Sequence, residues 1–189
     1  MDYTEIFGAV TGLLYVALEI KQKKLMWIVG GISALVYIFI FFDSSLYAAA
    51  GLQIYFAAAS LYGWCVWSSR EGSEGSREPV VVPMPVRIAV ISSSVALAAF
   101  FLLWYLLAEY SNDPAPFADA LIAILSMLAT FWVSHKFIQH WILWIAANII
   151  AIYIYFSLAL YATTALYFIY LIAAMVGWLH WRKFRRVLY

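Results

Sequence analysis

Two side-chain amides, those of Gln53 and Asn148, lie deep inside apolar stretches of this sequence. An amide in hydrocarbon costs free energy unless it finds a hydrogen-bond partner. Such a side chain therefore either bonds to a neighbouring helix or faces a polar cavity that can hold a ligand. Both interpretations remain open for these two residues, and the side chains around them favour a cavity.

Aromatic residues accompany both amides at helical spacing. Trp141, Trp144 and Asn148 follow an i, i+3, i+7 pattern, which places two indoles and an amide on one face of a helix. Ring faces attract cations and amides bond to hydroxyl groups or ring nitrogens, so this face suits a flat organic ligand, including a cationic one. The candidate substrate-binding residues, all amide or aromatic, are Trp141, Trp144, Asn148, Gln53, Phe56, Tyr167 and Tyr170.

Residues that could catalyse a reaction or hold a metal are scattered along the chain. The carboxylates of Glu19 and Asp43 lie near predicted helix ends, and His135, His140 and His180 form no i, i+4 pair on one helix. A single cysteine excludes internal disulfides and cysteine-based metal motifs. No nucleophile motif or phosphate-binding loop is visible. We therefore expect no enzyme, no catalytic residue, no metal, no cofactor, no nucleic-acid partner and no coupling to a proton or sodium gradient.

The elements that must position these residues are membrane-spanning helices. Hydrophobic residues make up 67% of the 189 positions and charged residues 11%, too few to cover a water-soluble core. A bilayer crossing takes about 20 apolar residues, which leaves room for seven spans and no sizeable soluble domain. The predicted spans are 4–20, 25–42, 46–67, 86–107, 117–134, 138–158 and 162–181.

The basic residues support the number of spans and predict their direction. If seven spans alternate, all 11 lysines and arginines fall on one side of the membrane. The positive-inside rule makes that side cytoplasmic, so the N-terminus is expected outside and the C-terminus in the cytoplasm. These residues are Lys21, Lys23, Lys24, Arg70, Arg77, Arg87, Lys136, Arg182, Lys183, Arg185 and Arg186.

The chain also contains an internal repeat. Shifting the sequence by 114 residues aligns 27–67 with 141–181 without a gap, and 13 of 41 pairs are identical, tryptophans and glycines among them. This predicts an all-α membrane protein with two parallel three-helix repeats joined by a linking helix, a three-plus-one-plus-three architecture. The expected parts are a first repeat (1–67), a cytoplasmic linker (68–85), helix four with its outer turn (86–116), a second repeat (117–181) and a basic cytoplasmic tail (182–189).

Several of these motifs together resemble the PnuC-type vitamin transporters. They are Trp141-Ile-Leu-Trp144 followed by Asn148, the Gly51-Leu-Gln53-Ile-Tyr55-Phe segment, and the Gly-Trp-x-x-Trp ending of each repeat. The likeness covers nearly the whole chain. It implies a homotrimer in the bacterial inner membrane, with one substrate path through each protomer and contacts with membrane lipid. It also implies that Trp141, Trp144, Asn148 and Gln53 contact the substrate, with Tyr167 and Tyr170 completing the pocket.

The resemblance further implies facilitated diffusion of nicotinamide riboside, which a cytoplasmic kinase then phosphorylates so that it cannot leave. Thiamine is the close alternative, because Tyr167 and Tyr170 stand where a ribose site would prefer amides or carboxylates, and riboflavin is carried by related members. A seven-helix membrane sensor or receptor is an alternative of another class. Such a receptor would bind its ligand yet show no counterflow.

Overall fold

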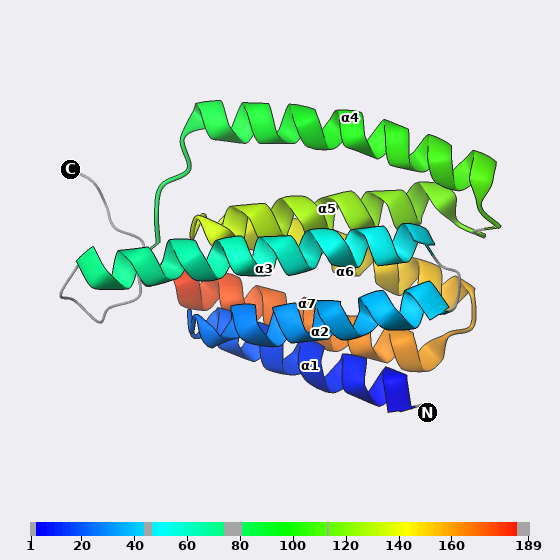
Figure 1. Cartoon of the computed structure of the whole chain (residues 1–189), viewed down its shortest axis with the longest axis horizontal. Coiled ribbons are helices and arrows are strands. Elements are labelled where there is room, and N and C mark those ends of the chain that lie inside the picture. Colours follow the sequence, from blue (N-terminus) through cyan, green and yellow to red (C-terminus); the bar gives the residue numbers. More distant parts are fainter. Residues whose placement is uncertain (1–2, 44–46, 74–80, 113, 185–189) are drawn as a thin grey trace.

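The structure, a computed structural model, describes residues 3–43, 47–73, 81–112 and 114–184. These residues form seven helices that lie side by side as one bundle (Figure 1). The number of helices is the number that hydropathy and charge predicted. Their bounds are α1 Tyr3–Ile20, α2 Leu25–Asp43, α3 Tyr47–Ser73, α4 Val86–Tyr110, α5 Pro116–Ser134, α6 His140–Ser157 and α7 Tyr161–Arg182.

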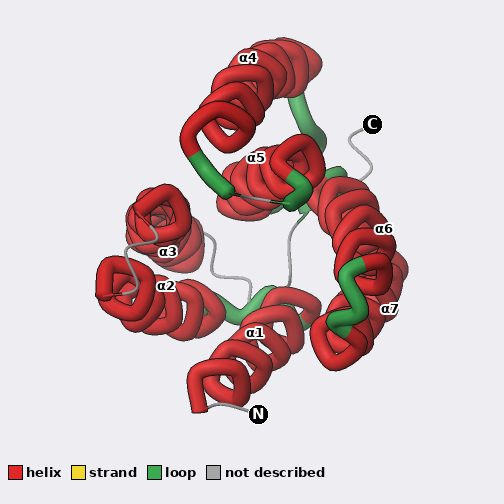
Figure 2. Tube along the Cα trace, turned by 90° about the vertical axis from the view of Figure 1, so that its right-hand side faces the viewer, coloured by secondary structure: helices red, strands yellow, loops and turns green. Residues whose placement is uncertain are grey.

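Six of the helices close into a ring, and the seventh lies outside it. The ring runs α1, α2, α3, α5, α6, α7 and back to α1, each helix packing against the next (Figure 2). Helix α4 packs only against α5 among the described residues, where the indole Nε1 of Trp132 donates a hydrogen bond of 3.0 Å to the hydroxyl of Ser92. The ring encloses a central space, whereas α4 is a peripheral element.

The outer surface of the bundle is apolar, as a lipid environment requires. Large hydrophobic side chains along α4, such as Val95 and Leu102, are 64% and 60% exposed, a density of exposed apolar area that a water-soluble monomer does not show. Six helices are long and apolar enough to cross a membrane, and the apolar part of α1, Ile6–Ile20, is shorter. The chain is thus a multi-pass membrane protein, with α1 the marginal span.

Corresponding contacts occur in the two halves of the ring. In the first half, the indole of Trp27 lies edge-on to Trp67, with ring centroids 5.6 Å apart and planes at 89°. In the second half, Trp141 meets Trp181 at 5.9 Å and 83°. The residues that match at the offset of 114 therefore make the same packing contact in space.

Reciprocal hydrogen bonds join the two halves. The indole Nε1 of Trp67 on α3 donates to the carbonyl of Ser134 at the end of α5, at 3.0 Å. Likewise, Nε1 of Trp181 on α7 donates to the carbonyl of Glu19 at the end of α1, at 3.1 Å. Each half thus donates a hydrogen bond to a carbonyl at the last turn of the other half.

The helix bounds differ from those expected in two places. Helix α3 continues to Ser73, six residues into the segment expected to be a linker, because its Ser, Arg and Glu residues suit a solvated helical turn as well as a loop. Farther along that segment, Val81 is 2% exposed, and Val82 donates a backbone hydrogen bond to Lys136 at 3.2 Å. Helix α4 runs to Tyr110, three residues beyond the expected end.

Candidate substrate site

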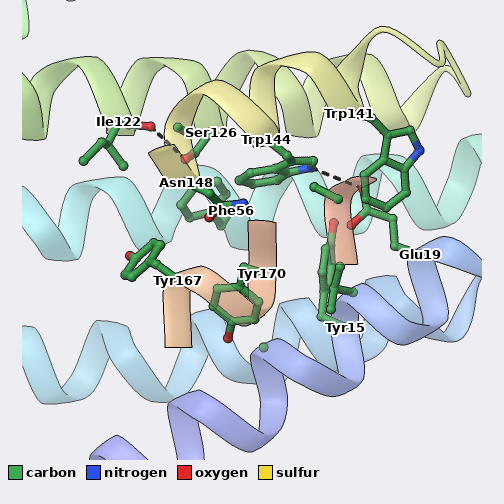
Figure 3. Close-up of a pocket in the computed structure, with 14 residues that line it drawn as sticks. Tyr15, Glu19, Phe56, Ile122, Ser126, Trp141, Trp144, Asn148, Tyr167 and Tyr170 are labelled. Carbon is green, nitrogen blue, oxygen red and sulfur yellow. Dashed lines mark hydrogen bonds between the residues drawn. The ribbon is translucent and has the colours of Figure 1, made fainter. Parts of the chain in front are cut away.

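A cavity of about 280 Å³ lies inside the ring, lined by residues of α1, α3, α5, α6 and α7 (Figure 3). Its walls are mainly aromatic, and an amide and a carboxylate supply the strongest polar groups. Six of the seven residues predicted from the sequence line it. They are Trp141, Trp144, Asn148, Phe56, Tyr167 and Tyr170, and the other lining residues are Gly12, Tyr15, Val16, Glu19, Ile122, Ser126, Ala147 and Ala174.

Helix α6 presents its polar-aromatic face to this cavity, as the i, i+3, i+7 spacing predicted. Asn148 is 6% exposed, and its amide has no hydrogen-bond partner among the side chains and backbone groups that the structure describes. An interhelical clamp, the alternative for this residue, would require such a partner. The Asn148 amide is instead available to a molecule in the cavity.

The two tryptophans of this face differ in their surroundings. Trp141 is fully buried, and its indole packs against Gly177 and Trp181, so most of its surface serves packing. Trp144 is partly buried, and its Nε1 donates a hydrogen bond of 3.3 Å to Oε1 of Glu19. Of the two indoles, Trp144 therefore has more ring surface left for a ligand.

Helix α7 supplies the opposite wall with two tyrosines (Figure 3). The ring of Tyr167 stacks on Tyr155 of α6 with centroids 5.2 Å apart and planes at 25°. Tyr170 stands nearly perpendicular to Tyr167, with centroids 5.9 Å apart and planes at 87°. Phe56 from α3 closes the cavity on a third side. These rings enclose the space in which a flat molecule would lie.

Gln53 does not line this cavity. It lines a second one, of about 180 Å³, which shares Gly12, Tyr15, Phe56 and Trp144 with the first. The structure thus assigns the two amides, which the sequence grouped together, to different cavities. The remaining residues that line the second cavity are Gly8, Thr11, Gly30, Ser33, Ala34, Ser60 and Thr130.

The two cavities correspond to each other at the offset of 114. Most residues that line the first have their partners in the second, among them Asn148 with Ala34 and Tyr167 with Gln53. The corresponding side chains differ in chemistry. Six aromatic side chains line the first cavity and three line the second. The second adds four aliphatic hydroxyl groups and an amide, namely those of Thr11, Ser33, Ser60, Thr130 and Gln53.

Glu19 is a cavity residue that the sequence reasoning passed over because it stands near the end of α1. The residue is 1% exposed. Its Oε1 accepts the hydrogen bond from Trp144 and lies 3.1 Å from Nε2 of His140. The signal that could have found it is a single charged residue within the apolar segment Ile6–Ile20, since a carboxylate in such a segment usually has a function.

A closed ring of membrane helices around two adjacent cavities defines a multi-pass membrane protein that can enclose a small organic molecule. A family model described as "Nicotinamide mononucleotide transporter" matches residues 2–183. The chain belongs to this family, the PnuC family of vitamin transporters, and it is a transporter, not an enzyme. The resemblance noted in the sequence is confirmed.

Individual relatives span most of the chain. The nicotinamide riboside transporter PnuC of Escherichia coli (strain K12) is 28% identical over 96% of this chain and 85% of its own length. The riboflavin/roseoflavin transporter RibM of Streptomyces davaonensis is 26% identical over 93% of this chain and 82% of its own. A crystal structure of the vitamin B3 transporter PnuC superposes with a TM-score of 0.73 at 20% identity, over 96% of this chain and 81% of that one.

Proposed function

We propose that this protein transports nicotinamide riboside across the membrane by facilitated diffusion. The observation that carries the proposal is the pair of adjacent cavities, which share Gly12, Tyr15, Phe56 and Trp144. A flat nicotinamide ring suits the first, where Trp144, Tyr167 and Tyr170 supply ring faces and Asn148 an amide. The ribose suits the second, where hydroxyl groups and the Gln53 amide can bond to sugar hydroxyls.

The family description names the mononucleotide, but the cavities favour the riboside. A phosphate group is usually held by arginine, lysine or a cluster of backbone amides. Neither cavity is lined by a lysine or arginine from the described part of the chain, and the first contains the carboxylate of Glu19, which would repel a phosphate. A nucleoside fits this charge distribution better than a nucleotide.

Thiamine and riboflavin remain the alternatives. Thiamine is a cation without ribose, so it would use the aromatic cavity and leave the hydroxyl groups of the second cavity without sugar partners. Riboflavin has a polyol chain but a neutral and wider ring, and the relative named for it is the RibM transporter. A sensor or receptor would bind one of these molecules without moving it, and counterflow is the property that separates the two classes.

The proposal includes the arrangement in the membrane. With seven crossings, we infer an N-terminus outside and a C-terminus in the cytoplasm. The described lysines and arginines with placed side chains lie at the end of the bundle where α1 ends and α6 begins (Figure 1), which the positive-inside rule makes the cytoplasmic end. The corresponding tryptophan contacts and the reciprocal indole bonds support two parallel three-helix repeats linked by α4. By resemblance, the protein is a homotrimer in the bacterial inner membrane, and a cytoplasmic kinase traps the product.

The decisive experiment is uptake by purified protein in liposomes. Vesicles preloaded with unlabelled nicotinamide riboside should accumulate the labelled compound by counterflow, without an imposed proton or sodium gradient. The Asn148→Ala variant should lose uptake, whereas Asn112→Ala, an exposed amide outside both cavities, should behave like the wild type. Binding without counterflow would identify a receptor, and dependence on an ion gradient would contradict facilitated diffusion.

A titration of nicotinamide riboside, thiamine and riboflavin against the purified protein decides between substrates. We expect the riboside to bind most tightly. If thiamine binds more tightly, the hydroxyl groups of the second cavity are not a ribose site and the alternative substrate holds. If Trp144→Ala and Asn148→Ala both bind like the wild type, the assignment of the first cavity is wrong.

A further inference from the structure

Glu19 brings a carboxylate to a cavity whose other walls are uncharged. The remaining residues that line the first cavity are aromatic, small, aliphatic, or carry a hydroxyl or an amide. A buried charge in such surroundings is costly unless an opposite charge or hydrogen bonds accompany it. The ligand charge that this cavity favours therefore depends on Glu19.

His140 lies next to this carboxylate. Its Nδ1 lies 2.7 Å from the carbonyl of Phe137, and since a carbonyl only accepts, Nδ1 must carry a hydrogen. That bond fixes the orientation of the imidazole ring. Its Nε2 lies 3.1 Å from Oε1 of Glu19, so the two buried side chains are in contact.

Of these two side chains, only that of Glu19 lines the cavity. Glu19 lines it, whereas His140 lies behind, fully buried against the rings of Trp141 and Trp181 at centroid distances of 4.6 Å and 4.7 Å. Trp144 connects the carboxylate to the aromatic wall through its indole hydrogen bond (Figure 3). A molecule in the cavity therefore contacts Glu19 and not His140.

We propose that Glu19 is the residue that makes this transporter prefer a positively charged ring over a neutral one. The carboxylate attracts a ring cation held among the aromatic faces, which themselves favour cations. His140 and Trp144 act as positioning residues that fix the carboxylate at the cavity wall. This inference rests on the proposed function, since it concerns the same cavity, and it names the class of substrate as aromatic cations.

The test compares two ligands of nearly equal shape and different charge. Nicotinamide riboside carries a cationic ring, and its reduced dihydro form a neutral one. Glu19→Gln is close in size and retains an oxygen that can accept from Trp144, so it removes mainly the charge. We expect it to weaken binding of the cation by about tenfold or more and binding of the neutral form by less than about twofold.

The matched control is Glu109→Gln, which removes one exposed carboxylate from α4, outside both cavities. It should leave both affinities unchanged. A purely structural role for Glu19 would lower the two affinities equally in Glu19→Gln, and that result would overturn the inference. If the wild type binds neither ligand, the proposed function itself fails, which is a different outcome.

A second measurement does not depend on whether Glu19→Gln folds. The wild-type protein should bind nicotinamide riboside at least about tenfold more tightly than its neutral dihydro form, because the carboxylate favours the charged ring. Equal affinities, or tighter binding of the neutral form, would overturn the inference. Glu19→Asp, which keeps the charge, should retain the preference for the cation even where its overall affinity falls.

Discussion

The indole of Trp141 lies directly on the backbone of Gly177, so close that a Cβ atom at this glycine would overlap the six-membered ring. The same relationship holds between Trp27 and Gly63 in the other half of the ring. In both places the absence of a side chain lets a helix approach the flat face of a buried indole. The helices that carry these residues, α6 with α7 and α2 with α3, depend on this close approach.

We predict that Gly177→Ala destabilises the protein by about 1–3 kcal/mol, because the added methyl group has to push a buried indole aside. Gly63→Ala should have a similar effect through Trp27. Gly51→Ala is the matched control, since nothing lies within 4 Å of a Cβ at that helical position. Thermal unfolding in detergent should show lower midpoints for the first two variants only. Unchanged midpoints would show that the indoles can move freely.

The reciprocal indole bonds give a second prediction. Trp181→Phe and Trp67→Phe each remove one donor and leave the carbonyl of Glu19 or Ser134 without it, so each should cost about 1 kcal/mol. The two losses should be similar, because the contacts correspond. Trp178→Phe is the control, because its indole makes no such bond to the opposite half within the described part of the chain. Thermal unfolding measures all three, and a loss confined to one half would contradict the correspondence.

Trp144 should contribute to binding in two separable ways. Trp144→Phe keeps an aromatic ring but removes the donor to Glu19, so we expect affinity for nicotinamide riboside to fall by about fivefold. Trp144→Ala also removes the ring face and should weaken binding by tenfold or more, on the order of 1.5 kcal/mol. Isothermal titration checks both. Trp104→Phe on α4, outside both cavities, should match the wild type.

Gln53 and Asn148 should affect different parts of the substrate. Gln53→Leu removes an amide from the hydroxyl-lined cavity. It should weaken binding of nicotinamide riboside by about fivefold and leave binding of free nicotinamide unchanged. Asn148→Leu removes the amide of the aromatic cavity and should weaken binding of both ligands. Competition binding with the two ligands provides the measurement. Equal effects of Gln53→Leu on both ligands would show that the second cavity does not hold the ribose.

The proposed orientation can be tested by labelling. In a Cys65→Ser background, Ser111→Cys at the end of α4 should react with a membrane-impermeant maleimide in intact cells. Lys23→Cys between α1 and α2 should react only after the membrane is permeabilised. The reason is that the lysines and arginines cluster on the Lys23 side, which the positive-inside rule makes cytoplasmic. The reverse pattern of labelling would mean that the chain inserts the other way.

Much of the architecture follows from the sequence because membrane helices are determined by local properties. Apolar length defines a span, and breaks such as 21–24 or 135–137 end one. The result was seven helices with bounds close to those expected. The offset of 114 also paired Trp27 with Trp141 and Gly63 with Gly177, and the structure shows these residues in equivalent contacts. Trp141, Trp144 and Asn148 line one cavity together, because helical spacing determines which side chains share a face of α6.

Only the tertiary structure decided which faces meet. The sequence placed Gln53 beside Asn148, but closure of the ring assigns them to two cavities that share Trp144 and Phe56. It also brings Glu19 and His140, more than a hundred residues apart in the chain, to 3.1 Å. Neither residue had a partner at helical spacing, so no periodicity could reveal the pair. Spacing along the chain determines which side chains share one face of a helix. Which faces touch depends on the packing of the whole ring, and that packing makes the carboxylate of Glu19, near the end of α1, part of the cavity wall.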